Sequence, residues 1–289
     1  MANEVLEIER KAMDISICSF SFHRLLAAGK QDMFKYITDC KELGVTLLDP
    51  WNAHLAPLQD SEAVLKVGTD PENASLAPLH EDYLGRVKHA ADEAGLPFGC
   101  IAVDGAHIYE PTLEKRQANR TLAYEWLEVA ERLGARQVRI DAGGPEEMPD
   151  DVFQIIVEGY KDLIARGQNK SIEIVIENHW GPSKFPDNVV KLMEAVDGLG
   201  LLLDTNNWAT GTREQGWEMC AKYATATHIK TFSFDEQGYE PSVDIPKAMH
   251  TLIDAGYKGC WGIESCPKDG DEYEGAKKTI ALIKRVLNA

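Results

Sequence analysis

Short apolar runs alternate with amphipathic stretches along the whole chain. Eight runs have the length and composition of buried strands, namely 14–20, 45–51, 97–104, 136–142, 172–178, 200–206, 225–232 and 259–265. Between them, apolar residues recur at helical spacing over 31–44, 80–95, 119–134 and 151–167, and several of these stretches close on a Gly where a left-handed cap residue belongs. The repeated order predicts parallel strands joined by crossover helices.

Eight such units over 289 residues predict an α/β fold, a single (β/α)8 TIM barrel that takes up residues 1–289 as one domain. An open doubly wound sheet is the alternative. Against it, no GxGxxG follows the first run, and the AGG after the fourth run is too short for a dinucleotide fingerprint. The longest irregular stretch, 52–78, is interpreted as either a lid or a loop that carries a short helix.

Polar residues stand at or just beyond the end of every predicted strand, where barrel enzymes place their chemistry. These residues are His23, Asp49, Trp51, Asp104, His107, Arg139, Asp141, Glu177, His179, Asp204, His228, Lys230 and Glu264. Each one alone has an ordinary structural explanation, because strand ends meet solvent and an Asp often caps the helix that follows. Their occurrence on every strand favours a functional site.

The fifth to the eighth strands deliver Glu177, Asp204, His228 and Glu264. Adjacent strands lie about 4.8 Å apart, so side chains at four neighbouring strand ends can converge on one point. Three carboxylates packed together need a cation to offset their repulsion. The mixed set of oxygen and imidazole ligands predicts a fairly hard divalent ion, Mn²⁺ or Mg²⁺ before Zn²⁺ or Co²⁺.

Charge and composition restrict the partners of the protein. A net charge of −17 repels phosphate backbones and anionic membranes, and there is no clustered stripe of Lys and Arg, so neither nucleic acid nor a membrane is expected as a partner. We find no apolar membrane span and no secretory signal, and we expect a cytoplasmic protein. The six scattered cysteines lack a CxxC pair and are expected to be reduced thiols.

The segments VIEN, LLLDTNN, THIKTF and WGIES resemble the metal-binding strand ends of the xylose isomerase-like TIM barrels. This sugar isomerase and epimerase group also includes apurinic endonucleases and inosose dehydratases. In order and spacing the segments are similar to those of the ketose 3-epimerases, and that resemblance implies that a single Mn²⁺ or Co²⁺ is held by Glu177, Asp204, His228 and Glu264.

The departures from the family pattern leave the substrate open. Ketose 3-epimerases usually carry a His where this chain has Asn207 and an Arg where it has Phe234. Asn207 also stands where the multi-zinc endonucleases of the superfamily have a His ligand. Together with the charge of −17, this argues against DNA cleavage.

The constellation predicts removal of a proton next to a carbonyl group. In a ketose bound to the metal through its carbonyl and neighbouring hydroxyl oxygens, the adjacent C–H would be acidified, because the metal stabilises the enediolate that forms. Glu177 and Glu264 are the predicted catalytic residues. One would remove the proton and the other would return one to the opposite side, which inverts the stereocentre.

The other strand-end residues are predicted to bind the substrate. They are His23, Trp51, Asp104, His107, Arg139, His179, Trp208 and Lys230. Because side chains alternate along a strand, His179 shares the orientation of Glu177 while Asn178 points away. Arg139 is interpreted either as tying strand-end carboxylates together or as orienting Glu177. Lys230 either pairs with the acidic cluster or polarises a substrate oxygen.

Aromatic residues and loop composition favour a neutral ligand. Trp51, Trp180, Trp208 and Trp261 fall at or near strand ends, where indole rings stack on sugars or aryl groups. The loops after the seventh and eighth strands are acidic and lack a Gly-rich cradle for phosphate. A neutral sugar or glycoside is therefore expected rather than a sugar phosphate.

Three functions remain open. The first is a metal-dependent isomerase or epimerase of a keto sugar or polyol derivative. The second is a lyase that uses the same proton abstraction to expel a leaving group, as in inosose dehydratases or in subunits that deglycosylate 3-keto-glycosides, including C-glycosides. The third is a non-catalytic sugar-binding or partner subunit. The family resemblance also implies a homo-oligomer, either a dimer or a tetramer.

Overall fold

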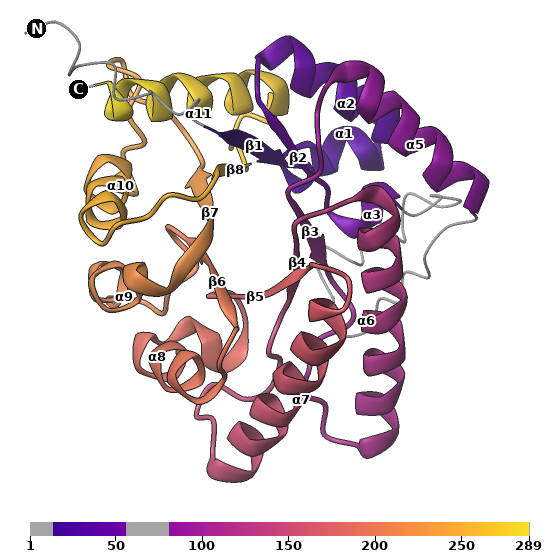
Figure 1. Ribbon diagram of the computed structural model, residues 1–289. Coiled ribbons are helices and arrows are strands. Elements are labelled where there is room, and N and C mark those ends of the chain that lie inside the picture. The colour runs from indigo at the N-terminus through magenta and orange to yellow at the C-terminus, as the bar shows by residue number, and fades with distance from the viewer. Residues whose placement is uncertain (1–13, 56–80, 289) are drawn as a thin grey trace, which may run out of the picture.

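The computed structural model describes residues 14–55 and 81–288, in which eight parallel strands form a nearly closed barrel (Figure 1). The strands are β1 (Ile15–Cys18), β2 (Leu47–Asp49), β3 (Cys100–Val103), β4 (Gln137–Ile140), β5 (Glu173–Glu177), β6 (Gly200–Asp204), β7 (Ala224–Thr231) and β8 (Trp261–Ser265). They pair in the order β2-β1-β8-β7-β6-β5-β4-β3. This is the predicted α/β fold, a (β/α)8 TIM barrel.

The seam between β2 and β3 closes the barrel through isolated bridges. Leu48 pairs with Phe98 and Trp51 pairs with Ala102, both in parallel. Between the two bridges, Pro50 accepts a hydrogen bond from the Ala102 N–H at 3.0 Å. Proline has no N–H to donate, so fewer backbone hydrogen bonds can form between β2 and β3 at this position.

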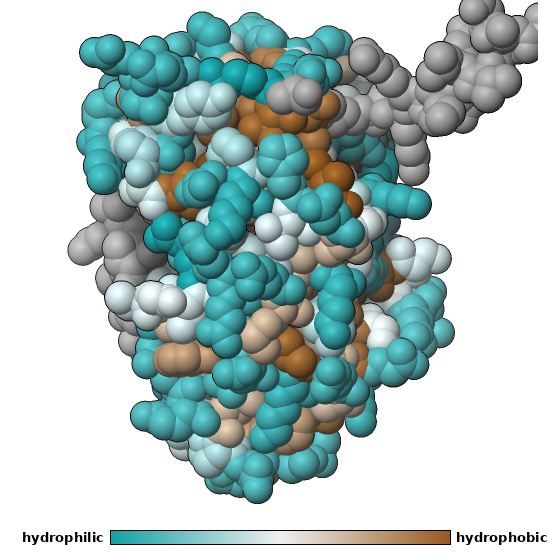
Figure 2. Space-filling view, turned by 90° about the vertical axis from the view of Figure 1, so that its left-hand side faces the viewer, coloured by the Kyte–Doolittle hydropathy of each residue, from teal (hydrophilic) through white to brown (hydrophobic). Residues whose placement is uncertain are grey.

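Helices cover the outside of the barrel (Figure 1). They are α1 (His23–Ala27), α2 (Met33–Leu43), α3 (Asn52–Leu55), α5 (Glu81–Ala94), α6 (Leu113–Leu133), α7 (Asp150–Gln168), α8 (Pro186–Ala195), α9 (Arg213–Cys220), α10 (Ile245–Asp254) and α11 (Glu272–Leu287), with 3₁₀ helices η1 (Ser19–Phe22), η2 (Gly181–Lys184) and η3 (Ala221–Tyr223). Figure 2 shows the face over α8, α9 and α10, where hydrophilic residues predominate and hydrophobic ones form smaller groups.

Helix ends follow the predicted cap chemistry with one exception. Gly44 and Gly134 end α2 and α6 in the left-handed conformation, each with φ of 72°. Thr112 caps the start of α6 by accepting a hydrogen bond from the Lys115 N–H at 3.3 Å, so this helix begins at Leu113 rather than at the predicted residue 119. Gly167 does not end α7, which continues to Gln168.

Gly167 is needed for a different reason. A Cβ atom at this position would lie 2.7 Å from the backbone oxygen of Ile172. Only glycine lets α7 pass this close to the chain that leads into β5. Among the glycines that close the predicted helical stretches, Gly167 is therefore not a left-handed cap residue.

A small apolar layer lies inside the barrel. It consists of Cys100, Val175, Leu202 and Ala226 and is separate from the larger core between strands and helices. Side chains two positions apart on a strand point to the same side. Glu177, Asp204 and His228, each two residues beyond a member of this layer, therefore point into the barrel at its carboxyl end.

The predicted lid segment 52–78 falls mostly outside the described residues. Its first residues form α3, and residues 56–78 are not described, so the lid stays a prediction.

Two further expectations concern membranes and thiols. In residues 14–55 and 81–288, no helix is long and apolar enough to cross a membrane. All six cysteines lie in these ranges and are free thiols, four of them buried.

Replacing Gly167 by alanine should destabilise the fold, whereas the same replacement of another helical glycine, Gly85, should not. Gly85, in α5, has no atom of the described chain within 4 Å of an added Cβ. We expect Gly85→Ala to raise the free energy of unfolding by about 0.5–1 kcal/mol through helix propensity. Gly167→Ala should lower it by about 1–3 kcal/mol, because the backbone must shift. Urea denaturation measures both. Equal stabilisation by the two substitutions would contradict the close approach.

Candidate metal centre and active site

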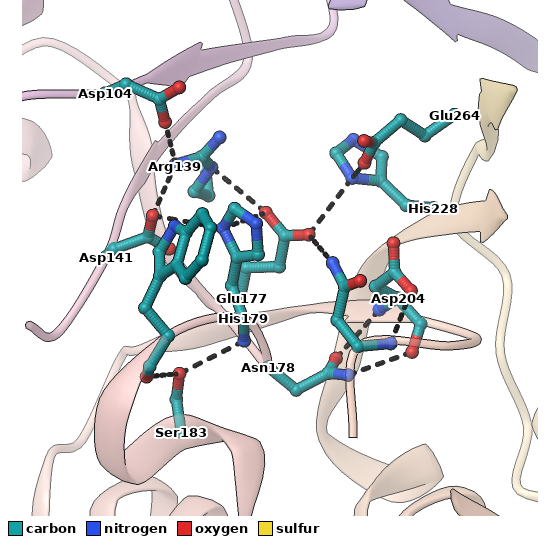
Figure 3. Close-up of polar contacts among 12 residues, drawn as sticks. Asp104, Arg139, Asp141, Glu177, Asn178, His179, Ser183, Asp204, His228 and Glu264 are labelled. Atoms are coloured by element: carbon teal, nitrogen blue, oxygen red, sulfur yellow. Dashed lines mark hydrogen bonds and ion pairs between the residues drawn. The ribbon is translucent and has the colours of Figure 1, made fainter. Parts of the chain in front are cut away.

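Four ligand-type side chains from consecutive strands meet at the carboxyl end of the barrel (Figure 3). Glu177 ends β5, Asp204 ends β6, His228 lies in β7 and Glu264 lies in β8. All four are buried, and one potential ligand atom from each lies within 4.8 Å of the others. Strand register contributes directly, because Asp204 is the pairing partner of His228. The structure thus brings together the four residues that the sequence pattern singled out, hereafter the four-residue cluster.

Two cationic side chains of β7 lie among the carboxylates. His228 Nδ1 is 2.9 Å from Glu264 Oε2 and 3.3 Å from Glu177 Oε1. The Lys230 ammonium donates a hydrogen bond to Glu264 Oε1 and lies 3.9 Å from Asp204 Oδ2. Lys230 therefore pairs with the acidic cluster, as one of its two interpretations had it.

Asp204 is held by backbone and amide groups. Its Oδ1 accepts hydrogen bonds from the N–H groups of Asn206 and Asn207 at 2.6 and 2.9 Å. The Asn178 amide donates to the Asp204 carbonyl at 2.9 Å and accepts from the Asp204 N–H at 2.8 Å. Asn178 therefore points away from Glu177, toward β6, and fixes the end of that strand.

Arg139 on β4 is a buried guanidinium among three carboxylates (Figure 3). Its Nη1 donates to Asp104 Oδ1 at 2.8 Å and to Asp141 Oδ2 at 2.7 Å. Its Nε lies 3.2 Å from Glu177 Oε2. The sequence analysis interpreted Arg139 either as tying strand-end carboxylates together or as orienting Glu177. The observed contacts are compatible with both interpretations, because Arg139 bridges Asp104 and Asp141 and also faces Glu177.

His179 lies on the same side of the chain as Glu177. Its Nδ1 is 3.3 Å from Asp141 Oδ2 and 3.8 Å from Glu177 Oε2, so its hydrogen-bond partner is Asp141. The imidazole packs on the indole of Trp180, with ring centroids 4.2 Å apart. The His179 N–H donates to Ser183 Oγ at 3.1 Å, which fixes the turn after β5.

Burial and charge set the protonation of the carboxylates. Burial opposes ionisation of Glu177, but the nearby histidines and Arg139 outweigh it and lower the pKa of Glu177 to about 2. Burial likewise opposes ionisation of Glu264, but Lys230 and His228 outweigh it and hold the pKa of Glu264 well below its usual range. Asp204 differs, because burial raises its pKa to about 6 and Lys230 offsets this only in part.

The two cations of β7 respond to the same charges. Burial disfavours protonated His228, but the Glu177 carboxylate outweighs it and raises the pKa of His228 well above its ordinary value. Burial also disfavours charged Lys230, yet Glu264 raises the pKa of Lys230 well above the ordinary lysine value. Both side chains are therefore positively charged at neutral pH without a metal ion.

A cavity of about 400 Å³ opens onto the four-residue cluster. His228 and Glu264 contribute to its lining directly. Of the residues predicted to bind the substrate, six line this cavity, namely Trp51, Asp104, Arg139, His179, Trp208 and Lys230. Trp180, which the sequence analysis named for its indole ring, also lines the cavity. The sequence analysis did not single out the remaining lining residues, which are Cys18, Phe20, Lys184, Asn206 and Asn207.

Two predicted substrate-binding histidines do not line this cavity. His23 Nδ1 is 2.8 Å from the Phe20 carbonyl and 3.2 Å from Glu272 Oε1 of α11. His107 Nε2 is 2.7 Å from Glu110 Oε1. His23 therefore pairs with Phe20, which itself lines the cavity, and with Glu272, whereas His107 pairs with Glu110; neither histidine is part of the lining.

Two other residues from the predicted strand ends also lie away from the cavity. Asp49 accepts hydrogen bonds from the Cys100 N–H at 2.8 Å and from the Ser16 hydroxyl. Trp261 begins β8 rather than ending it and packs against Tyr257, with ring centroids 5.0 Å apart. Trp261 was expected at or near a strand end and stands at the amino end of β8, so it does not contribute to the cavity at the carboxyl end.

A sequence signal for part of the missed lining was present. Asn206 and Asn207 stand two and three residues after Asp204, and an Asp side chain commonly accepts hydrogen bonds from the backbone two or three residues on. The Asn207 amide also donates to Glu177 Oε1 at 3.3 Å. Cys18 ends β1 and interacts with His228, a contact that only the closed barrel reveals.

The four-residue cluster fits a divalent cation. Asp204 Oδ2 is buried and has no hydrogen-bond partner within the described residues. Carboxylate oxygens and one imidazole suit Mn²⁺ or Mg²⁺ and also allow Co²⁺ or Zn²⁺. A metal-ligating histidine must be neutral, so binding of an ion would release the proton that His228 carries.

Family comparison agrees with this architecture. A family model described as the xylose isomerase-like TIM barrel matches residues 37–286. The chain belongs to this family. The resemblance drawn from the strand-end segments is thereby confirmed. Among curated proteins, no sequence matches this xylose isomerase-like barrel.

Solved structures share the fold over nearly their whole length. D-psicose 3-epimerase from Clostridium cellulolyticum H10, solved with D-tagatose, has a TM-score of 0.70 and 12% identity, covering 95% of this chain and 99% of its own. A 3-keto-D-glucoside 4-epimerase from E. coli has a TM-score of 0.68 and 14% identity, covering 94% and 99%. A probable 3-DHS dehydratase from Bacillus anthracis has a TM-score of 0.68 and 13% identity, covering 94% and 99%. At these identities the likeness shows the fold.

The raised pKa of Asp204 predicts a pH-dependent effect of Asp204→Asn on the metal-free barrel. Burial raises this pKa from 3.8 to about 6 in the folded protein. Above pH 6 the charged carboxylate therefore destabilises the folded state. Below pH 3.8 this cost disappears, because the carboxyl group is protonated in both the folded and the unfolded protein. In EDTA, Asp204→Asn should therefore stabilise the protein by roughly 1–3 kcal/mol at pH 7, with the gain shrinking toward pH 4.

Urea denaturation at several pH values measures this difference, and Mn²⁺ supplies the control. With the ion present, wild type should be the more stable protein, because only its charged Asp204 is a strong ligand. A difference between wild type and variant that does not change between pH 4 and pH 7 in EDTA would refute the electrostatic account.

Proposed function

We propose that this xylose isomerase-like barrel is a divalent-metal-dependent isomerase or epimerase of a neutral keto sugar or polyol derivative. The observation that carries the proposal is the four-residue cluster, in which three buried carboxylates and an imidazole converge at the edge of a polar cavity. Similar folds in sugar epimerases support this class of reaction.

The proposed metal ligands are Glu177, Asp204, His228 and Glu264, with Mn²⁺ as the expected ion. When bound, the ion would supply positive charge that stabilises the anion left after a proton departs from the carbon next to a carbonyl. Asn206 and Asn207 would keep Asp204 Oδ1 occupied, so that Oδ2 faces the ion.

The proposed proton carriers are Glu177 and Glu264. Their low pKa values keep both carboxylates ionised at neutral pH, which is the state that a general base requires. They come from β5 and β8, with β6 and β7 between them. Glu264 lines the cavity, whereas Glu177 lies behind the lining residues Arg139 and Asn207, which contact it. One would take a proton from the substrate carbon. The other, which is ionised at rest, would first take up a proton, from solvent or, for Glu264, from the Lys230 ammonium that donates to it, and would then deliver that proton to the opposite side of the carbon.

The lining of the cavity suits a neutral sugar. Trp51 and Trp208 offer indole surfaces, while Asp104, Arg139, His179 and Lys230 offer hydrogen bonds to hydroxyl groups. His23 and His107 would bind substrate only at the periphery, since neither lines the cavity. A homo-oligomer or a partner subunit, and a cytoplasmic location, remain predictions.

Elimination is the second candidate, and one contact favours it. The ammonium of Lys230 lines the cavity and lies between Glu264 and Asp204. A charged amine beside a proton-accepting carboxylate can protonate a departing oxygen, as a dehydratase or a deglycosylating lyase requires. The similar fold of a probable dehydratase is compatible with this alternative.

Loss of ligands should abolish metal binding without unfolding the protein. We expect Asp204→Ala and His228→Ala to lose bound Mn²⁺ and activity, because each removes a ligand atom at a strand end. Asp49→Asn is the matched control, since Asp49 is a buried barrel carboxylate outside the cluster and should leave metal content unchanged. Metal analysis after dialysis decides the matter. Stoichiometric Mn²⁺ in both ligand variants would show that the assignment is wrong.

Glu177→Gln and Glu264→Gln should separate proton transfer from metal binding. Glutamine keeps a coordinating oxygen but carries no proton, so each variant should bind metal while turnover falls by about 10²–10⁴-fold. In an epimerase, each variant should keep C–H exchange with D₂O only for the epimer that faces its surviving glutamate.

NMR of ketoses, inososes and 3-keto-glycosides in D₂O with Mn²⁺ supplies the readout. Deuterium next to the carbonyl with an intact skeleton indicates isomerisation, and loss of water or of an aglycone indicates elimination. Undiminished turnover in both glutamine variants would refute the mechanism with two carboxylates.

A further inference from the structure

Glu177 belongs to two groups of metal-ligand type side chains. One is the four-residue cluster, and the other consists of Asp141, Glu177 and His179, whose ligand atoms also lie within 4.8 Å of one another. The two carboxylate oxygens divide between the groups. Oε1 is 3.3 Å from His228 Nδ1, and Oε2 is 3.8 Å from His179 Nδ1. Glu177 is therefore placed to bridge two cations.

A guanidinium already lies against the second group. Arg139 reaches Asp141 Oδ2 at 2.7 Å and Glu177 Oε2 at 3.2 Å. Arg139 and Asp141 are only 4% and 5% exposed, and Glu177 is 1% exposed, so water screens these charges poorly. An arginine does not lose its proton in proteins, so this positive charge is permanent.

Arg139 is also anchored on its other side. Its Nη1 donates to Asp104 Oδ1 at 2.8 Å and to the Val103 carbonyl at 3.3 Å. Asp104 is fixed in turn by the indole N–H of Trp51 at 2.8 Å. An incoming ion would have to drive a guanidinium away from buried carboxylates, which is strongly unfavourable.

We propose that Arg139 takes the place of a second metal ion, so that the centre binds one divalent ion and the group of Asp141, Glu177 and His179 becomes a metal site only when Arg139 is removed. Asp141 Oδ1 and Glu177 Oε2 are buried without a hydrogen-bond partner among the described residues, so ligand oxygens are available there. The inference rests on the proposed function in one respect, the assignment of the first ion to the four-residue cluster.

The test counts the Mn²⁺ ions bound to the full chain after chelator treatment and dialysis against Mn²⁺. Electron paramagnetic resonance then distinguishes an isolated ion from a spin-coupled pair bridged by a carboxylate. Wild type is expected to bind one ion per chain with the spectrum of an isolated Mn²⁺. Arg139→Lys, which keeps the positive charge, is expected to do the same.

Two matched double variants isolate the role of Arg139. Arg139→Met with Asp104→Asn, and Arg139→Met with Asp141→Asn, each remove one positive and one negative charge from the same buried network. Only the first keeps all three ligands of the second group. We expect it to bind two Mn²⁺ ions with a coupled spectrum and the second double variant to bind one.

The outcomes separate this inference from the proposed function. Two ions in wild type, or one ion in both double variants, would overturn the role of Arg139 and leave the first metal site standing. No ion in wild type would overturn the inference and the metal-dependent function together. The wild-type count needs no substitution, so it tests the inference even where a double variant does not fold.

Discussion

The carboxylates of Glu177, Asp204 and Glu264 lie side by side at the carboxyl end of the barrel, and each of these residues is at most 6% exposed. Like charges brought together out of water repel strongly, and this repulsion explains the polar contacts around them. Arg139 faces Glu177 and Lys230 pairs with Glu264. Asp204 is the least compensated of the three, with a pKa raised to about 6. A divalent ion at this point would complete the charge balance.

The barrel makes the convergence of these groups geometrically simple. β5, β6, β7 and β8 are consecutive neighbours in the sheet. On the first three of these strands, the apolar residues Val175, Leu202 and Ala226 lie two positions before the members of the four-residue cluster. Asn178 links the ends of β5 and β6 through two hydrogen bonds with the Asp204 backbone. The site therefore depends on strand register more than on any loop.

Much of this arrangement was predictable from the sequence, because a strand buried on both faces must read as an apolar run and its carboxyl end must face the site. Glu177, Asp204, His228 and Glu264 followed from that rule. Contacts made by packing did not. His23 stands near a strand end but pairs with Glu272 of α11, a partner that no spacing in the sequence reveals, and His107 pairs with the nearby Glu110 instead of lining the cavity.

Gly167 and Arg139 are two further residues whose contacts could not be predicted from the sequence. Gly167 carries the sequence mark of a helix cap, yet its role is to let α7 approach the Ile172 carbonyl. Arg139 was recognisable as a strand-end cation, but its simultaneous contacts with Asp104, Asp141 and Glu177 require the closed barrel. The local sequence pattern identifies the candidate residues, and the tertiary structure determines which partners they contact.

The most direct test of the account is an anomalous difference map from crystals of the protein grown with Mn²⁺. The account predicts one strong peak in each chain, ligated by Glu177, Asp204, His228 and Glu264, with the Arg139 guanidinium still in contact with Asp141. A fully occupied ion elsewhere in the barrel, or a four-residue cluster that stays free of Mn²⁺ while Lys230 remains paired with Glu264, would contradict it.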